Sequence, residues 1–83
     1  MKMKYIMATI GGIENTPFIF PDFVAHNEMK RKLGNPEVTS AGFVNLDIVN
    51  GESIVICSGK STSLNLDSRE SDGKRITKYF RGY

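Results

Sequence analysis

The residues of this sequence that are best suited to chemistry lie between positions 59 and 72. In that segment, Gly59-Lys60-Ser61-Thr62 matches the end of a Walker A loop, whose glycine-rich backbone and lysine bind phosphate oxygens. The complete motif has a second glycine five residues before Gly59, and this chain has Ile54 there. The motif also needs a helix directly after the lysine, whereas residues 61–66 have an extended pattern. The sequence therefore argues against a nucleoside triphosphatase and leaves a hydroxyl-rich loop suited to an anion.

Four side chains of this segment form a candidate anion site. Lys60 supplies a mobile cation, and Ser61 and Ser63 offer hydroxyl groups on one side of an extended segment. Arg69 stands at the start of the next predicted helix, where free backbone amides favour negative charge. If the chain folds back before Arg69, these donors converge on one ligand. A small anionic ligand of nucleotide type would suit them.

The sequence offers no convincing catalytic pair. His26 is the only histidine, so a two-histidine metal site cannot form, and a lone histidine near a helix start is usually a hydrogen-bonding residue. Cys57 falls in the apolar phase of a predicted inner strand, where a thiol reacts slowly. We therefore expect a protein that is not an enzyme and that uses neither a metal nor a cofactor.

Length and composition favour one small globular domain over residues 1–83. Of the 83 residues, 40% are hydrophobic and 24% are charged, and no apolar run approaches the roughly 18 residues of a membrane span. The N-terminus lacks the apolar core of a secretion signal and a single cysteine cannot form an internal disulfide, so we expect a cytoplasmic protein that does not bind membranes. Because so short a chain builds only a marginal core, we also expect a homo-oligomer.

Alternation and turn residues predict an α+β fold with the order ββαββα, in which two β-hairpins form an antiparallel sheet with two short helices. The first hairpin joins residues 1–10 to residues 13–20 through Gly11-Gly12, and Pro17 restricts its second strand to an edge. The second hairpin joins residues 38–49 to residues 52–58 through Asn50-Gly51, with a bulge near Gly42. Alternating apolar residues in the last strand predict that both of its faces are partly covered.

Helical spacing predicts the two helices. The first follows Pro21-Asp22, with Asp22 or Asn27 as its N-cap and Gly34 just after its end. The second has Asp67 or Ser68 as its N-cap. Its buried stripe is expected to consist of Asp72, Ile76 and Phe80.

Charge is unevenly distributed, although the formal net charge is only +2. Every charged residue of the last ten is basic, and aromatic residues stand between them. This composition suits phosphate contact combined with base stacking, while the alternative is a solvated helix face. The basic residues concerned, which are candidates for contact with nucleic acid or a partner protein, are Lys74, Arg75, Lys78 and Arg81.

Several short motifs together resemble a group of small proteins of phages, prophages and other mobile elements that has no assigned activity. These motifs are Phe20-Pro21-Asp22, His26, Met29, residues 40–44, residues 58–64 and residues 68–72. The resemblance implies a phage-type accessory protein in the host cytoplasm that acts by binding, as an antagonist of host defence. It marks five positions without assigning them roles, namely His26, Ser40, Ser61, Ser63 and Arg69.

Three functions remain open at this point. The first is a binding protein that sequesters an anionic nucleotide-type ligand, with Lys60, Ser61, Ser63 and Arg69, joined by His26 and Ser40, as ligand-binding residues. The second is a protein inhibitor of a host nucleic-acid-handling complex, for example of CRISPR type. The third is direct binding of nucleic acid by the basic C-terminal helix.

Overall fold

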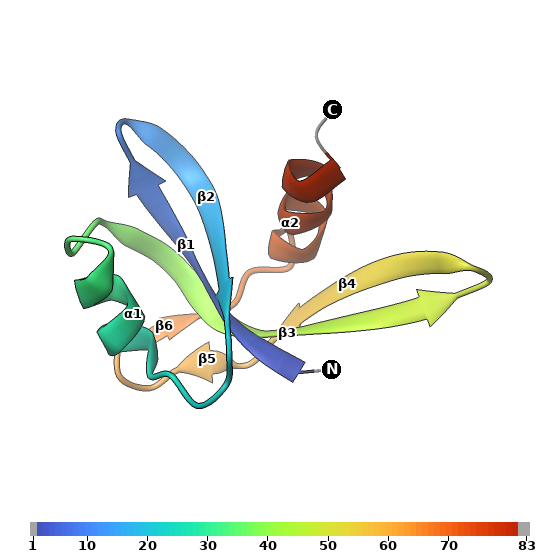
Figure 1. The fold of residues 1–83 in the computed structure, drawn as a ribbon, viewed down its shortest axis with the longest axis horizontal. Helices are drawn as coiled ribbons and strands as arrows, with labels where there is room; N and C mark the ends of the chain where they lie inside the picture. Colours follow the sequence, from blue (N-terminus) through green and yellow to red (C-terminus); the bar gives the residue numbers. More distant parts are fainter. Residues whose placement is uncertain (1, 82–83) are drawn as a thin grey trace.

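The computed structural model describes residues 2–81, which form a small compact α+β domain (Figure 1). A four-stranded antiparallel sheet, two helices and a separate pair of very short strands make up the fold. In chain order the elements are β1 Lys2–Ile10, β2 Ile13–Phe20, α1 His26–Lys32, β3 Val38–Val49, β4 Glu52–Ser58, β5 Lys60–Ser61, β6 Leu66–Asp67 and α2 Asp72–Arg81.

The two predicted hairpins are confirmed and form the main sheet in the order β2-β1-β3-β4. Gly11 and Gly12 turn the chain between β1 and β2 with positive φ angles of 58° and 82°. Asn50 and Gly51 do the same between β3 and β4, at 52° and 80°. As predicted, Pro17 lies in an edge strand, which needs no N–H on its outer side.

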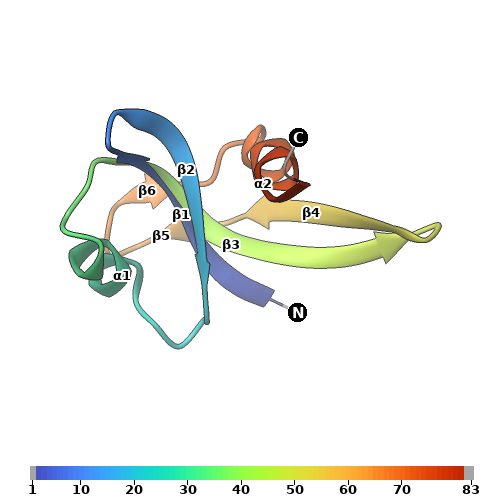
Figure 2. The ribbon, with the colours of Figure 1, turned by 45° about the horizontal axis from the view of Figure 1, so that its top comes forward.

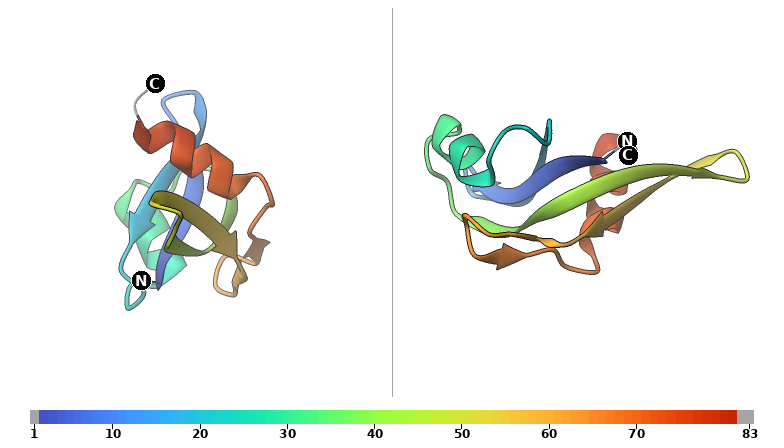
Figure 3. Two further views of the ribbon diagram at one scale, coloured as in Figure 1. Left: turned by 90° about the vertical axis from the view of Figure 1, so that its right-hand side faces the viewer. Right: turned by 90° about the horizontal axis from the view of Figure 1, so that it is seen from below.

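The β3–β4 hairpin is longer than the strand beside it. Pairing between β1 and β3 ends at Lys2 and Asn45, so residues 46–49 pair only with residues 52–55. This part, which we call the projecting hairpin (residues 46–55), extends away from the rest of the molecule and sets its longest dimension of 38 Å (Figures 1 and 3).

Each face of the sheet packs against one helix, because successive β1 residues point to opposite sides. Tyr5 and Met7 pack with Val44 and with Ile76 of α2. Ile6 packs on the other face, in a cluster that α1 covers. The members of this second cluster are Ile6, Phe20 and Ala41, with Val24, Met29, Leu33, Leu64 and Leu66 among the partly buried side chains around it. Figure 2 shows α1 and α2 on either side of the crossing of β1 and β3.

The structure corrects the predicted order of elements. Residues 59–71 were expected to hold no strand pair, but β5 and β6 form a small second sheet there, joined by a turn at residues 62–65. The order is therefore β1-β2-α1-β3-β4-β5-β6-α2, in which β5 and β6 are the strands that were not predicted. Asn65 has a positive φ of 54°, and an asparagine tolerates this conformation in a turn.

Five local predictions are also wrong. The N-cap of α1 is Ala25, which forms no side-chain cap, although Gly34 does end that helix with a φ of 85°. The helix α2 begins at Asp72 rather than directly after residues 67–68, and Phe80 is 60% exposed instead of buried. The β3 bulge lies at Thr39, where the register with β1 shifts, and not near Gly42. The outer face of β4 is uncovered, since Ile54 and Ile56 are exposed there.

Helix α2 packs very closely on β4. A Cβ atom at Gly73 would lie 2.6 Å from the backbone oxygen of Val55, so only glycine fits at this point. This contact compensates for the low helix propensity of Gly73 and brings Asp72 over the sheet. No helix of the described residues is long and apolar enough to cross a membrane.

Candidate functional site

A buried carboxylate at the start of α2 joins this helix to the sheet. The Oδ2 atom of Asp72 accepts hydrogen bonds from the Tyr5 hydroxyl at 2.5 Å and from the Arg69 backbone N–H at 3.0 Å. Its Oδ1 atom accepts from Arg69 Nε at 3.1 Å, in an ion pair whose carboxylate is completely buried. Arg69 Nη2 donates in turn to Asn15 Oδ1 of β2 at 2.7 Å. We call these four residues the polar network, since they connect the core to the surface.

The polar network fixes the protonation states of its acidic groups. Burial opposes ionisation of Asp72, but the hydrogen bonds from Tyr5 and Arg69 and the guanidinium charge hold the pKa of this carboxyl below its ordinary value. Burial raises the pKa of Tyr5, and the hydrogen bond to Asp72 raises it further. The buried Ser40 hydroxyl lies close enough to help lower the pKa of Asp72, although it has no hydrogen-bond partner among the described residues. Near neutral pH Asp72 stays ionised and Tyr5 stays protonated. This suits a structural role in holding α2 on the sheet rather than acid or base catalysis.

An open groove of about 360 Å³ lies where the surface end of the polar network meets α2. We call it the polar groove. It is lined by Ile13, Glu14, Asn15 and Thr16 of β2 and by Arg75, Lys78 and Tyr79 of α2.

Three features of the polar groove are relevant to binding. Arg75 is exposed, and its Nε atom donates to Ser71 Oγ at 3.3 Å, which holds the guanidinium beside the helix. Tyr79 is 44% exposed and so presents part of its ring. Asn15 adopts a positive φ of 56°, and Arg69 fixes the orientation of its amide. Together these groups offer cations, an aromatic surface and an oriented amide, with one carboxylate from Glu14.

The structure brings Ser61 and Ser63 together, as the predicted anion site requires, but uses both hydroxyls within the fold. Their Oγ atoms lie 3.5 Å apart. Ser61 Oγ is buried and accepts a hydrogen bond from the Leu64 N–H at 3.2 Å, while Ser63 Oγ accepts one from the Asn27 N–H, also at 3.2 Å. Ser63 thus provides, from a distant segment, the cap that Ala25 cannot give α1.

The other residues of the predicted anion site lie in different surroundings. Lys60 is exposed in β5, and its position in the strand register is opposite Asp67 of β6. Arg69 belongs to the polar network, and Ser40 lies buried beside it. Within the described residues no hydrogen bond connects Arg69 with the two serines.

His26 is a buried structural residue at the start of α1. Its Nε2 atom donates to the Gly42 backbone oxygen at 2.9 Å, and its ring meets Phe20 and Phe43 edge-on. Burial lowers the pKa of His26, and this hydrogen bond opposes the shift without reversing it. The imidazole is therefore neutral at pH 7 and makes specific contacts within the core.

Cys57 has the surroundings of an inert thiol. Its side chain is partly buried against the core under α2, and burial raises its pKa to about 11. The described residues contain no group of three His, Cys, Asp or Glu side chains placed to hold a metal ion.

The basic residues of α2 lie on its outer side. Lys74, Arg75 and Lys78 are all exposed, and the latter two also line the polar groove. Arg81 is the last residue of the helix, and its side chain lies outside the described part of the structure.

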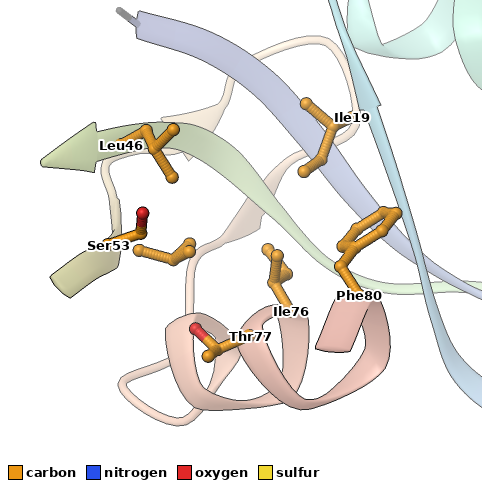
Figure 4. Close-up of a pocket in the computed structure, with 7 residues that line it drawn as sticks. Ile19, Leu46, Ser53, Ile76, Thr77 and Phe80 are labelled. Atoms are coloured by element: carbon orange, nitrogen blue, oxygen red, sulfur yellow. The ribbon is translucent and has the colours of Figure 1, made fainter. Parts of the chain in front are cut away.

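A second and larger groove lies on the other flank of α2, between the helix and the two hairpins. This apolar groove has a volume of about 490 Å³, and Figure 4 shows its side chains surrounding one hollow. Its lining residues are Ile19, Leu46, Ser53, Val55, Ile76, Thr77 and Phe80. An adjoining hollow of about 240 Å³ extends it along the sheet to Met3.

Sequence patterns did not identify Tyr5 and Asn15, which are needed to build the polar network. The pattern around Tyr5 predicts only an ordinary core residue of β1. Its partner Asp72 lies 67 positions away, and no local pattern predicts a contact over that separation. Asn15 carried one usable signal, because asparagine is enriched at positive φ.

Comparison with protein-family models, curated protein sequences and solved structures gives no match to this chain.

Proposed function

We propose that this protein is a non-enzymatic binding protein that holds an anionic, nucleotide-type ligand in the polar groove. The observation that carries the proposal is the placement of Arg75, Lys78 and Tyr79 around one hollow. A guanidinium and an ammonium group attract a phosphate, and a partly exposed tyrosine ring offers a base a stacking surface.

The polar network supports this location because it prepares one wall of the groove. Arg69 donates to the Asn15 side-chain oxygen, so that the amide nitrogen of Asn15 is oriented before any ligand arrives. Asp72 neutralises Arg69, and the groove therefore gains a rigid hydrogen-bonding group without another uncompensated charge. Arg69, chosen from sequence as a ligand-binding residue, then acts through Asn15.

Glu14 supplies selectivity in this proposal. Its carboxylate lines the same groove and repels a ligand with excess negative charge on that side. A nucleotide with one phosphate and a neutral base or sugar toward Glu14 fits this arrangement better than a polyphosphate does.

The hydroxyl-rich loop is less suitable for the ligand. Ser61 and Ser63 already accept hydrogen bonds from the backbone, and an anion would compete with contacts that hold the loop and α1. In the polar groove the Arg75 side chain and the Tyr79 ring are exposed.

Isothermal titration calorimetry with adenosine monophosphate tests the proposal. Replacing Arg75 with alanine should weaken binding about tenfold to a hundredfold, the range for a lost hydrogen bond to a charged group. Arg31→Ala removes an exposed arginine of α1 and should leave affinity unchanged. Lys60→Ala tests the loop, since a larger loss with this variant than with Arg75→Ala would contradict the proposed location.

A short single-stranded oligonucleotide provides the comparison with nucleic-acid binding. Under the proposal it binds no more tightly than the mononucleotide, and its affinity depends weakly on salt. Tight binding with a steep salt dependence would instead favour a nucleic-acid-binding surface made by Lys74, Arg75 and Lys78.

A further inference from the structure

We propose that the polar groove selects guanine among the nucleobases, so that its ligand is a guanine nucleotide with a single phosphate. This inference rests on the proposed function and adds to it the identity of the base. It comes from two neighbouring hydrogen-bonding groups that β2 places in the groove, the amide of Asn15 and the carboxylate of Glu14.

The amide of Asn15 is prepared as a hydrogen-bond donor. Arg69 Nη2 donates to Asn15 Oδ1 at 2.7 Å, which turns this oxygen toward the arginine. The arginine is itself held by its ion pair with the buried Asp72 carboxylate. The Asn15 side chain therefore leaves its NH₂ group, which can only donate, for a ligand in the groove. Such a group recognises an acceptor on the base, for example a ring carbonyl oxygen.

The carboxylate of Glu14 has the opposite character. It is exposed and lines the same groove. A carboxylate only accepts hydrogen bonds, and its two oxygens can accept from two adjacent donors at once. Glu14 therefore recognises a base edge on which two N–H groups stand side by side.

Guanine has the edge that fits this pair of groups. Its Watson–Crick edge carries the acceptor O6, followed by two donors, N1–H and the 2-amino group. The two donors match the Glu14 carboxylate, and O6 matches the NH₂ group of Asn15. Adenine has the acceptor N1 where guanine has a donor, so that a lone pair would face the carboxylate. Cytosine and uracil each offer a single donor group on this edge.

The other groups of the groove suit a purine nucleotide. Tyr79 is 44% exposed, and its ring packs edge-on with that of Phe80, with the centroids 5.2 Å apart. This contact restricts the tyrosine ring before any ligand arrives. Ile13, which is 67% exposed, adds an apolar side chain from β2. A purine offers both groups a larger stacking surface than a pyrimidine does, and Arg75 remains for the phosphate.

Isothermal titration calorimetry with three purine monophosphates tests the proposal, because these ligands share the phosphate and the sugar and differ only in the base. Guanosine monophosphate should bind about tenfold more tightly than adenosine monophosphate. This is toward the lower end of the discrimination that a bidentate pair gives, since Glu14 is exposed to water. Inosine monophosphate, which lacks the 2-amino group, should have an intermediate affinity.

The variant Glu14→Gln separates recognition of the base from binding in general. A glutamine amide offers one acceptor and one donor, the combination that pairs with adenine. This variant should bind guanosine monophosphate about tenfold more weakly than the wild type and adenosine monophosphate at least as tightly, so that the preference disappears or reverses. Glu52→Gln removes an exposed carboxylate of the projecting hairpin and is the matched control, which should keep the wild-type preference. Both positions are exposed, and circular dichroism checks that each variant is folded.

Three results would overturn the proposal, and they separate it from the proposed function. If guanosine and adenosine monophosphates bind equally well and Arg75→Ala weakens both, the proposed function stands and the assignment of guanine is wrong. If no purine monophosphate binds, the proposed function fails and the assignment fails with it. A preference for guanosine monophosphate that survives Glu14→Gln unchanged would exclude Glu14 as the group that recognises the base.

Discussion

Replacement of Asp72 with asparagine should strongly destabilise the protein. The side chains are nearly the same size, so the change tests charge and hydrogen bonding rather than packing. If the asparagine oxygen takes the place of Oδ2, it keeps the bonds from Tyr5 and the Arg69 N–H in a weaker, neutral form. Its NH₂ group then faces Arg69 Nε, where two donors meet.

The expected cost follows from these three contacts. Weakening two charge-assisted hydrogen bonds costs about 1 kcal/mol each, and losing the third with its ion pair adds about 1–2 kcal/mol after allowance for solvent at the arginine. The free energy of unfolding should therefore fall by about 3–4 kcal/mol. For a domain of this size the thermal midpoint should fall by roughly 15–25 °C.

Urea denaturation of wild type, Asp72→Asn, Tyr5→Phe and the double variant measures this effect. Tyr5→Phe alone should cost about 1–3 kcal/mol, and the double variant should cost less than the sum, because both changes remove the same hydrogen bond. The wild type should also lose stability as pH falls below 3.8, the ordinary pKa of aspartate, since the folded pKa is lower and the unfolded chain takes up the proton first. The Asp72→Asn variant should have a smaller acid slope. An Asp72→Asn protein within about 0.5 kcal/mol of wild type would refute the reasoning.

Three other predictions concern stability. The folded pKa of Cys57 is about 11, against an ordinary 9.0, so the unfolded chain loses the thiol proton first as pH rises. The free energy of unfolding should therefore fall by about 1.4 kcal/mol by pH 10. Cys57→Ala should remove this dependence on pH, and an unchanged dependence in the variant would exclude Cys57 as its cause. Because the folded pKa of His26 lies below its ordinary 6.5, stability should decrease as pH falls from about 6.5 toward 5, as measured by urea denaturation, and His26→Gln should flatten this profile. Gly73→Ala should destabilise the protein by about 1–3 kcal/mol in the same assay, because the new methyl group meets the Val55 backbone oxygen. This cost should exceed the gain from the better helix propensity of alanine. A more stable variant would show that α2 shifts at little cost.

Local patterns predicted much of the main sheet. Gly11-Gly12 and Asn50-Gly51 defined both hairpins, because a two-residue turn with positive φ angles has few suitable sequences. The alternation of Tyr5 and Ile6 indicated a strand, which is confirmed, and the two side chains are buried in different clusters on opposite faces of the sheet. These patterns depend on only a few neighbouring residues, so the local structure that they predict does not require contacts between distant segments.

The candidate site was harder to predict because it depends on contacts between distant segments. Ser63 caps α1, a helix 36 positions earlier, and Tyr5 bonds Asp72 across 67 positions. No local pattern encodes these pairs. Arg69 stood out because a basic residue is unfavourable at a helix start, but its partner Asp72 explains it without a ligand.

Periodicity also misjudged exposure. Phe80 lies on the same helix face as Asp72 and Ile76, but the space between the end of α2 and the sheet is the open apolar groove, so the ring remains exposed. The outer parts of β3 and β4 alternate like core strands, yet they extend beyond β1, and Ile48, Val49 and Ile54 remain exposed there.

The central claim is that the polar groove binds an anionic, nucleotide-type ligand, and titration of ¹⁵N-labelled protein with adenosine monophosphate tests it most directly. The account predicts that the backbone amide resonances of Asn15, Thr16, Lys78 and Tyr79 shift together and saturate, and that Arg75→Ala reduces these shifts at equal ligand concentration. Resonances that stay in place in the polar groove, or that move instead in the turn at residues 62–65, would contradict the claim.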